Sequence, residues 1–115
     1  MDISSDEYVD AVDALSRIGE NMSLYKRLLG RFIEENYYEE LIRVLQSGNV
    51  EDSARQAHSL KGVSANLSLN KIRVISSDLE QLIKSGADYS ECLAELKQAY
   101  DITVSKIAGI VQVGA

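Results

Sequence analysis

The 115-residue sequence contains no proline and no tryptophan, and it has only one cysteine and one histidine. Because proline interrupts helices, its absence favours long continuous helices. The single cysteine, Cys92, excludes an internal disulfide and fits a reducing compartment. No run approaches the roughly 20 apolar residues of a membrane-spanning helix. The acidic start, MDISSDEYVD, lacks the basic residues of a signal peptide. We therefore expect a cytoplasmic protein that makes no use of a membrane.

Charge is unevenly distributed along the chain. The formal net charge of −6 argues against a nucleic-acid-binding protein, because such proteins present a basic surface. Between Ser53 and Ser77 there is no aspartate or glutamate, and four basic residues give this stretch a charge of +4, which leaves −10 on the rest. A basic stretch in an acidic chain would suit an acidic partner or a bound anion.

Helix boundaries are marked by glycines and by residues that cap helices. Glycine readily adopts the left-handed conformation that ends a helix, and three glycines are suitably placed, at Gly19, Gly48 and Gly86. Side chains that can cap the first turn of the next helix follow them, at Asn21, Asn49 and Asp88. The segment from Asp88 to Glu91 resembles a capping box. These signals predict helices joined by short connections.

Apolar residues recur every three or four positions between these boundaries, as in amphipathic helices. One such stripe predicts a helix over 50–67, and it consists of Val50, Ala54, Ala57, Leu60, Ser64 and Leu67. A short N-terminal helix is expected to bury Tyr8, Val12, Leu15 and Ile18. A long helix is expected over 25–45, although its polar segment EENYYEE fits no face. The sequence predicts one all-α domain over residues 1–115, an antiparallel up-down four-helix bundle with an additional short N-terminal helix.

The only histidine, His58, lies in the predicted helix 50–67 beside the buried stripe. It is about 100° around the helix from Ala57, so its ring is expected at the edge of the stripe or outside it. Lys61 and Gly62 lie on the same face, one turn further on. Because glycine costs about 1 kcal/mol relative to alanine in a helix, Gly62 suggests that something approaches the backbone closely. The lysine would offset the charge of a phosphoryl group on the ring.

Simpler interpretations exist for each of these residues. A single histidine on a helix is usually a surface residue without a function, and Lys61 alone can be an ordinary solvated lysine. Gly62 can accommodate packing between crossing helices. One histidine and one cysteine are too few ligands for structural zinc, and Cys92 is expected in the core. The chain has no motif of a covalent nucleophile and no glycine-rich phosphate loop.

The segment AHSLKGVSANL, residues 57–67, resembles the signature of histidine-containing phosphotransfer (HPt) domains. The resemblance covers roughly residues 10–86, and the matching segments outside the signature are DALSRIG at 13–19, LY at 24–25, LL at 28–29, Phe32, DLE at 78–80 and KSG at 84–86. It implies a helical bundle that carries a phosphoryl group on a histidine.

The resemblance also implies a role for each residue of the site. His58 would accept the phosphoryl group from the aspartate of a receiver domain and pass it to another receiver. Lys61 would stabilise the phosphoryl charge, and Gly62 would leave room for the receiver. Glu80 would hydrogen-bond the other ring nitrogen and so orient the imidazole.

The expected partners are response-regulator receiver domains, and a hybrid sensor histidine kinase is a further candidate. The divalent ion of the reaction would belong to the receiver, so no cofactor and no metal site are expected in this chain. We expect a monomer that shows no turnover by itself, binds no nucleic acid and makes no contact with a membrane.

One position departs from the family pattern, and two alternative functions stay open. The family usually has glycine after the position of Leu67, where this chain has Ser68, and Ser68 is predicted to cap a helix that starts near Leu69. The first alternative is a helical interaction module that binds and sequesters a receiver without phosphoryl transfer. The second is an enzyme acting on a small molecule, for which the sequence offers no second convergent catalytic group.

Overall fold

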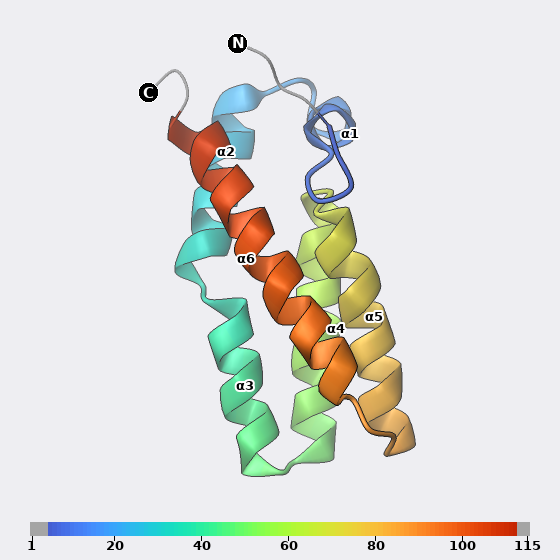
Figure 1. Ribbon diagram of the computed structural model, residues 1–115. Helices are drawn as coiled ribbons and strands as arrows, with labels where there is room; N and C mark the ends of the chain where they lie inside the picture. Colours follow the sequence, from blue (N-terminus) through green and yellow to red (C-terminus); the bar gives the residue numbers. More distant parts are fainter. Residues whose placement is uncertain (1–4, 113–115) are drawn as a thin grey trace.

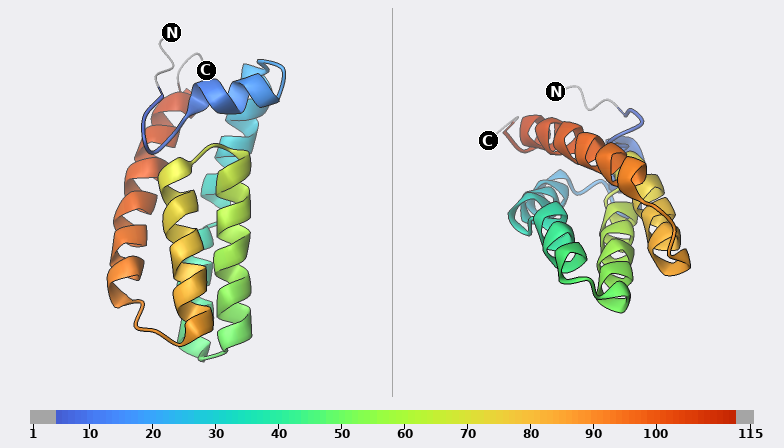
Figure 2. Two further views of the ribbon diagram at one scale, coloured as in Figure 1. Left: turned by 90° about the vertical axis from the view of Figure 1, so that its right-hand side faces the viewer. Right: turned by 60° about the horizontal axis from the view of Figure 1, so that its bottom comes forward.

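The computed structural model describes residues 5–112, and these residues form six α-helices and no strand: α1 (Ala11–Arg17), α2 (Met22–Glu34), α3 (Tyr37–Ser47), α4 (Val50–Asn66), α5 (Asn70–Ser85) and α6 (Ser90–Gln112). Helices α2 and α3 follow one another along one edge and together form one member of a four-membered bundle (Figure 1). The other three members are α4, α5 and α6, and successive members run antiparallel. The short α1 lies across the end of the bundle, above α4 and α5 (Figure 2). The predicted all-α bundle with an additional N-terminal helix is confirmed.

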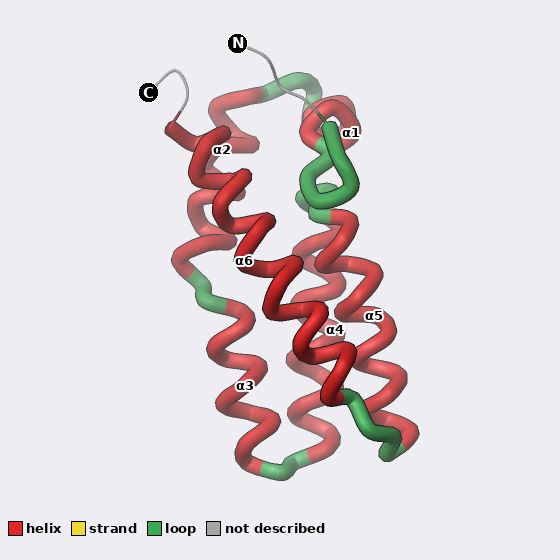
Figure 3. The backbone as a smooth tube through the Cα atoms, viewed as in Figure 1, coloured by secondary structure: helices red, strands yellow, loops and turns green. Residues whose placement is uncertain are grey.

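The break between α2 and α3 falls in the polar segment EENYYEE, where one continuous helix was expected (green between the two helices in Figure 3). That expectation is wrong, because Asn36 adopts the left-handed conformation, with φ 50° and ψ 52°. Asparagine tolerates this conformation better than most residues. The change of direction lets Tyr37 stack on Phe32, with ring centroids 5.3 Å apart, while Tyr100 of α6 contacts Phe32 at 5.5 Å. Such aromatic pairs contribute about 0.5–1.5 kcal/mol each and offset the strain at Asn36.

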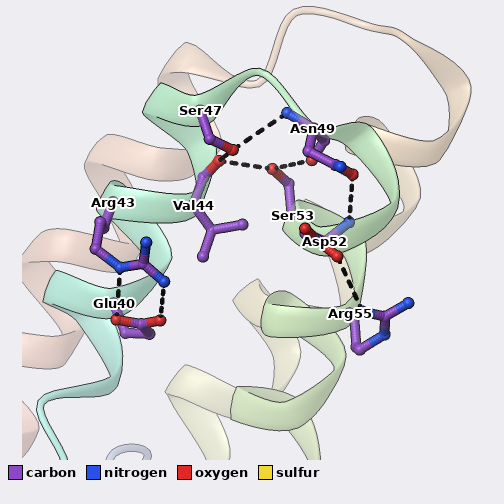
Figure 4. A network of polar contacts seen from close by, with 8 residues as sticks. All are labelled: Glu40, Arg43, Val44, Ser47, Asn49, Asp52, Ser53 and Arg55. Atoms are coloured by element: carbon purple, nitrogen blue, oxygen red, sulfur yellow. Dashed lines mark hydrogen bonds and ion pairs between the residues drawn. The ribbon is translucent and has the colours of Figure 1, made fainter.

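The α3–α4 turn fixes where the site-bearing helix α4 begins (Figure 4). Gly48 has φ 78°, and Asn49 Oδ1 accepts a hydrogen bond of 2.9 Å from the backbone N–H of Asp52. The hydroxyl of Ser53 donates to the carbonyl of Asn49 at 2.8 Å, and Arg55 forms an ion pair of 2.9 Å with Asp52. The predicted boundaries at Gly19, Gly86 and Asn21 are confirmed: both glycines have positive φ, and Asn21 accepts a hydrogen bond from the backbone of Leu24. The capping box predicted from Asp88 to Glu91 is wrong, because α6 begins at Ser90 and Asp88 accepts from the backbone N–H and the hydroxyl of Ser90 itself.

The core fills the space between the four members of the bundle. Its largest fully buried side chains are Tyr25, Leu29, Phe32, Leu41, Leu60, Leu69, Ile72, Leu79, Leu96 and Ile107. Burial of each contributes about 1.5–3 kcal/mol. Helix α4 adds small buried residues, Ala54, Ala57 and Ser64, which allow close packing. Two residues predicted to be buried are exposed, Val12 at 59% and Val50 at 57%. In α1 the buried face consists of Ala11, Ala14 and Leu15, so Val12 lies outside it, and the buried face of α4 begins only at Ser53.

The longest helix, α6, spans 23 residues and buries one face against the bundle, through Leu96, Ala99, Thr103 and Ile107. Exposed charged residues such as Lys97 and Asp101 flank this buried face. Across residues 5–112, no helix combines the length and the apolar character needed to cross a membrane.

The α4–α5 turn is built on Ser68 and is fastened to α1. Ser68 has φ 56°, a left-handed conformation that glycine adopts more easily. Its hydroxyl donates to Asp13 Oδ2 at 2.7 Å and accepts a hydrogen bond from the guanidinium of Arg17, while its carbonyl accepts from the backbone N–H of Asp10 at 2.9 Å. Leu69 occupies the N-cap position of α5 and makes no side-chain cap. The prediction that Ser68 caps this helix is therefore wrong, because its hydroxyl is committed to α1.

Candidate functional site

His58 lies in the middle of α4 with its ring at the surface of the bundle. Its side chain is 67% exposed, whereas Ala57 and Leu60, which flank it along the helix, are fully buried. The expected position at the edge of the buried stripe is confirmed. Because α4 is capped at its start and tied to α1 through the turn at its end, the ring projects from a well-supported helix.

Glu80 of α5 contacts the ring from the neighbouring helix. Its Oε1 lies 3.2 Å from His58 Nδ1, and its side chain is only 6% exposed. The second oxygen, Oε2, lies 2.9 Å from Nζ of Lys84, one turn further along α5. Burial alone would raise the pKa of Glu80, but the hydrogen bonds from Lys84 and His58 outweigh burial and hold the pKa below its ordinary value of 4.5.

The ionised state of Glu80 determines which ring nitrogen carries the proton. A carboxylate can only accept hydrogen bonds, so Nδ1 of His58 must be the donor. In the neutral imidazole the other nitrogen, Nε2, then holds the lone pair. The geometry therefore selects Nε2 as the nucleophilic atom of the ring.

Lys61 and Gly62 lie on α4 one turn beyond His58, as the sequence spacing predicted. The Lys61 side chain is half-buried, and within residues 5–112 its ammonium forms no ion pair. Gly62 is exposed, and a Cβ atom added to it would meet no atom within 4 Å in the part of the chain that the structure describes. Packing between helices of this chain therefore does not require glycine at this position, and the space above Gly62 is open to another molecule.

Lys84 is the residue of this site that the sequence reasoning missed. A shallow groove of about 540 Å³ runs beside His58, lined by Val50, Ala54 and Arg55 of α4 and by Glu80 and Lys84 of α5. In the sequence, Lys84 was read only as part of the helix terminator. Its spacing of four residues from Glu80 was the available signal, because residues at i and i+4 are neighbours on a helix.

A second hollow, of about 480 Å³, lies on the side of α4 that faces α1 and α2. Its apolar lining includes Ile18, Leu28 and Val63, while Arg17 and Arg31 add positive charge and Glu35 adds a negative charge. Val63 directly follows Gly62 in α4, so this hollow lies on the same stretch of helix as the glycine. An apolar depression bordered by charged residues is one type of protein-docking surface.

The other chemically distinctive residue, Cys92, is placed away from this site. It is half-buried on α6 rather than fully in the core, and its thiol lies 3.6 Å from the carbonyl oxygen of Ile75. Burial raises the pKa of the Cys92 thiol, and Asp78 and Glu95 add to the shift. A raised pKa disfavours the reactive thiolate. In the described part of the chain, no three His, Cys, Asp or Glu side chains are arranged to hold a metal ion.

Comparison with known proteins places this chain in a family. A family model described as Hpt domain matches residues 27–105, which include all four residues singled out in the sequence, His58, Lys61, Gly62 and Glu80. No curated protein and no solved structure gave a match. Hpt domains are phosphotransfer modules rather than autonomous enzymes, and they interact with receiver domains and kinases in two-component phosphorelays. The chain belongs to the histidine-containing phosphotransfer (Hpt) domain family and has a role in histidine phosphotransfer.

Proposed function

We propose that this chain is a phosphorelay intermediate that accepts a phosphoryl group on Nε2 of His58 from a receiver-domain aspartate and transfers it to another receiver. One observation carries the proposal. The exposed ring of His58 is held at Nδ1 by Glu80, at 3.2 Å, which leaves Nε2 as the nitrogen with a lone pair.

In the proposed step, the Nε2 lone pair attacks phosphorus, the N–P bond forms, and the bond from phosphorus to the receiver's aspartyl oxygen breaks. The aspartate leaves as a carboxylate. The ring keeps its Nδ1 proton and becomes positively charged, and the Glu80 carboxylate balances that charge. The reverse sequence on a second receiver regenerates neutral His58.

The remaining residues supply charge and access. The Lys61 ammonium, which forms no ion pair in residues 5–112, is available to the phosphoryl oxygens. Phosphoryl transfer depends mainly on positioning and charge neutralisation. We propose that the divalent ion is supplied by the receiver and that this chain has no turnover by itself.

We further propose that the receiver docks over Gly62 and the hollow lined by Ile18, Leu28 and Val63. A receiver approaching there would meet apolar surface, together with the guanidinium groups of Arg17 and Arg31 and the carboxylate of Glu35. Receiver domains carry an acidic phosphorylation pocket, which the two arginines would complement.

The test is to incubate the chain with a receiver carrying a labelled phosphoryl group and to examine the label. Transfer should give label that is labile to acid and stable to base, as expected for phosphohistidine, and His58→Gln should abolish it. Label persisting on His58→Gln would contradict the assignment. Stable receiver binding without any phosphate exchange would instead support a module that only sequesters the receiver.

A further inference from the structure

We propose that Lys84 is a positioning residue for the phosphoacceptor: its ammonium holds the buried Glu80 carboxylate in the orientation that presents Oε1 to His58 Nδ1. The inference rests on the proposed role of His58 and extends it to a residue outside the histidine motif. It assigns the two oxygens of one carboxylate to two different partners.

The two carboxylate oxygens of Glu80 contact residues on two different helices. Oε1 lies 3.2 Å from Nδ1 of His58 on α4, and Oε2 lies 2.9 Å from Nζ of Lys84 on α5. With one oxygen fixed by Lys84, rotation of the carboxylate about its terminal bond would break a charged contact. Lys84 therefore restricts the direction in which the other oxygen can accept a hydrogen bond.

Lys84 also provides the positive charge that offsets the free-energy cost of burying the ionised Glu80 carboxylate. The Glu80 side chain is 6% exposed, and an ionised carboxylate at such a position is costly without a partner of opposite charge. Two other charged groups line the groove, Glu51 and Arg55, but Arg55 is paired with Asp52 at 2.9 Å. The uncharged form of the His58 ring can donate a hydrogen bond but cannot neutralise the charge.

When the Lys84 ammonium is removed, the buried Glu80 carboxylate can respond in three ways. The carboxylate takes up a proton, it turns toward solvent, or it draws a proton onto His58 to form an imidazolium. In the first two cases Nδ1 loses its ionised acceptor, and in the third Nε2 loses its lone pair. Each response lowers the fraction of His58 in the neutral form that is protonated on Nδ1 and unprotonated on Nε2.

The competing interpretation is an ordinary surface ion pair that only supports α5. The chain provides a matched control for it on α6, where Lys97 and Asp101 have the same four-residue spacing and the same distance of 2.9 Å. Both lysine side chains are 55% exposed, but Asp101 is 58% exposed and Glu80 only 6%. Lys97 also lies over the Tyr38 ring, 5.4 Å from its centroid. The control therefore tests whether loss of any exposed lysine from such a pair changes the His58 ring, and the buried acid in contact with His58 is what distinguishes Lys84.

The first measurement is ¹⁵N NMR of the full chain with labelled histidine, which reports directly on protonation at each nitrogen of the single ring. At neutral pH, Lys84→Met should reduce the Nδ1-protonated neutral form, Lys84→Arg should restore it, and Lys97→Met should leave it at the wild-type level. Thermal unfolding of each variant shows whether the bundle is intact. An unchanged ring in a folded Lys84→Met variant would overturn the proposal, and Lys84→Gln serves if Lys84→Met does not fold.

The second measurement uses potassium phosphoramidate, a small phosphoryl donor that needs no receiver. Nε2 attacks phosphorus, the P–N bond of the donor breaks, and ammonia leaves. Lys84→Met should slow labelling of His58 roughly three- to tenfold, the range that the loss of one orienting hydrogen bond accounts for. Slower labelling with an unchanged ring would mean that Lys84 acts directly on the phosphoryl group, which would also overturn the positioning role.

These results are separable from a failure of the proposed function. The NMR measurement needs neither a receiver nor phosphate, so a Lys84 effect on the ring would stand even if no receiver transferred to His58. Conversely, transfer from a receiver to His58 in Lys84→Met at the wild-type rate, with an unchanged ring, would leave the relay function intact and remove Lys84 from it.

Discussion

Two lysines lie near the same imidazole, and they are committed to different partners. Lys84 is bound to the Glu80 carboxylate, whereas the Lys61 ammonium forms no ion pair in residues 5–112. A cation already bound to a carboxylate offers less to an incoming anion than one that is unpaired. Lys61 is therefore the residue expected to respond to phosphorylation of His58, and Lys84 the residue expected to prepare the ring for it.

Lys61→Ala should shorten the lifetime of the phosphohistidine or slow its formation, because the negative charge on the phosphoryl group loses its nearest unpaired cation on α4. We expect an effect of a few-fold, typical of one partly exposed charge contact worth about 1 kcal/mol. Loss of label from the isolated phosphorylated chain measures the lifetime. Lys71→Ala, at the start of α5, removes the same charge elsewhere, and rates that match between the two variants would remove Lys61 from the mechanism.

Gly62→Ala should stabilise the fold while it slows transfer from a receiver. An added Cβ meets no atom of residues 5–112 within 4 Å, so the helix gains about 0.5–1 kcal/mol from the better helix former. Gly109→Ala on α6 is the matched control, because its surroundings are equally open. Urea unfolding should show a gain in both variants, but only Gly62→Ala should slow receiver transfer. Gly62→Leu should slow it further without unfolding the bundle; loss of helical signal would indicate a packing role instead.

At the scale of the helices, local sequence signals succeed where a helix end depends on its own residues. The glycine stops and asparagine caps around Gly48 and Asn49 follow from local chemistry and are confirmed. The break at Asn36 could not be predicted, because it depends on the packing of Phe32 against both Tyr37 and Tyr100, and Tyr100 lies far away in the sequence. No proline or glycine marks that break.

The position of Ser68 was misread for the same reason. Serine is a favoured N-cap, and nothing local indicates otherwise. Its hydroxyl is instead bound by Asp13 and Arg17 of α1, partners that only the tertiary fold brings near. In the site, the spacing in α4 predicted the common face of His58, Lys61 and Gly62, whereas the approach of Glu80 from α5 followed only from the family resemblance.

Substitutions at Ser68 should separate its backbone strain from its hydrogen bonds. Ser68→Ala removes the contacts with Asp13 and Arg17 and keeps the left-handed strain, so we expect a loss of about 2 kcal/mol in the free energy of unfolding. Ser68→Gly loses the same contacts but relieves about 1 kcal/mol of strain. Urea unfolding of both variants measures the difference. Equal losses would show that the positive φ carries no cost.

At the scale of the whole molecule, the buried acid links the site to the pH dependence of folding. Because the pKa of Glu80 is lower in the folded chain than its ordinary value of 4.5, the unfolded chain binds more protons in that range. The stabilisation is complete above pH 4.5 and is lost as the pH falls through the folded-state pKa. Asp6, Asp10 and Asp88 also have lowered pKa values and contribute in the same direction.

Glu80→Gln should therefore flatten the decrease in stability on acidification without abolishing it. The free energy of unfolding, measured by urea titration from about pH 7 down to about pH 3, gives the comparison. The difference between wild type and Glu80→Gln should shrink as the pH falls below 4.5. Parallel curves would mean that Glu80 has the same proton affinity in the folded and unfolded chain.

Because α1 packs across the end of the bundle, a fragment that lacks α1 is expected to be less stable than the full chain. The family match begins at residue 27, after α1 and after Tyr25, whose hydroxyl donates to the carbonyl of Leu67 at 3.1 Å. A fragment of residues 27–105 would keep every residue of the phosphoacceptor motif. It would lose buried Ala14 and Leu15 of α1 and buried Ile107 of α6, and it would leave Ser68 strained without its partners. We expect such a fragment to melt well below the full chain, and restoring residues 5–26 to it should recover part of the lost stability. The segment that matches the family model is thus expected to be smaller than the unit that folds.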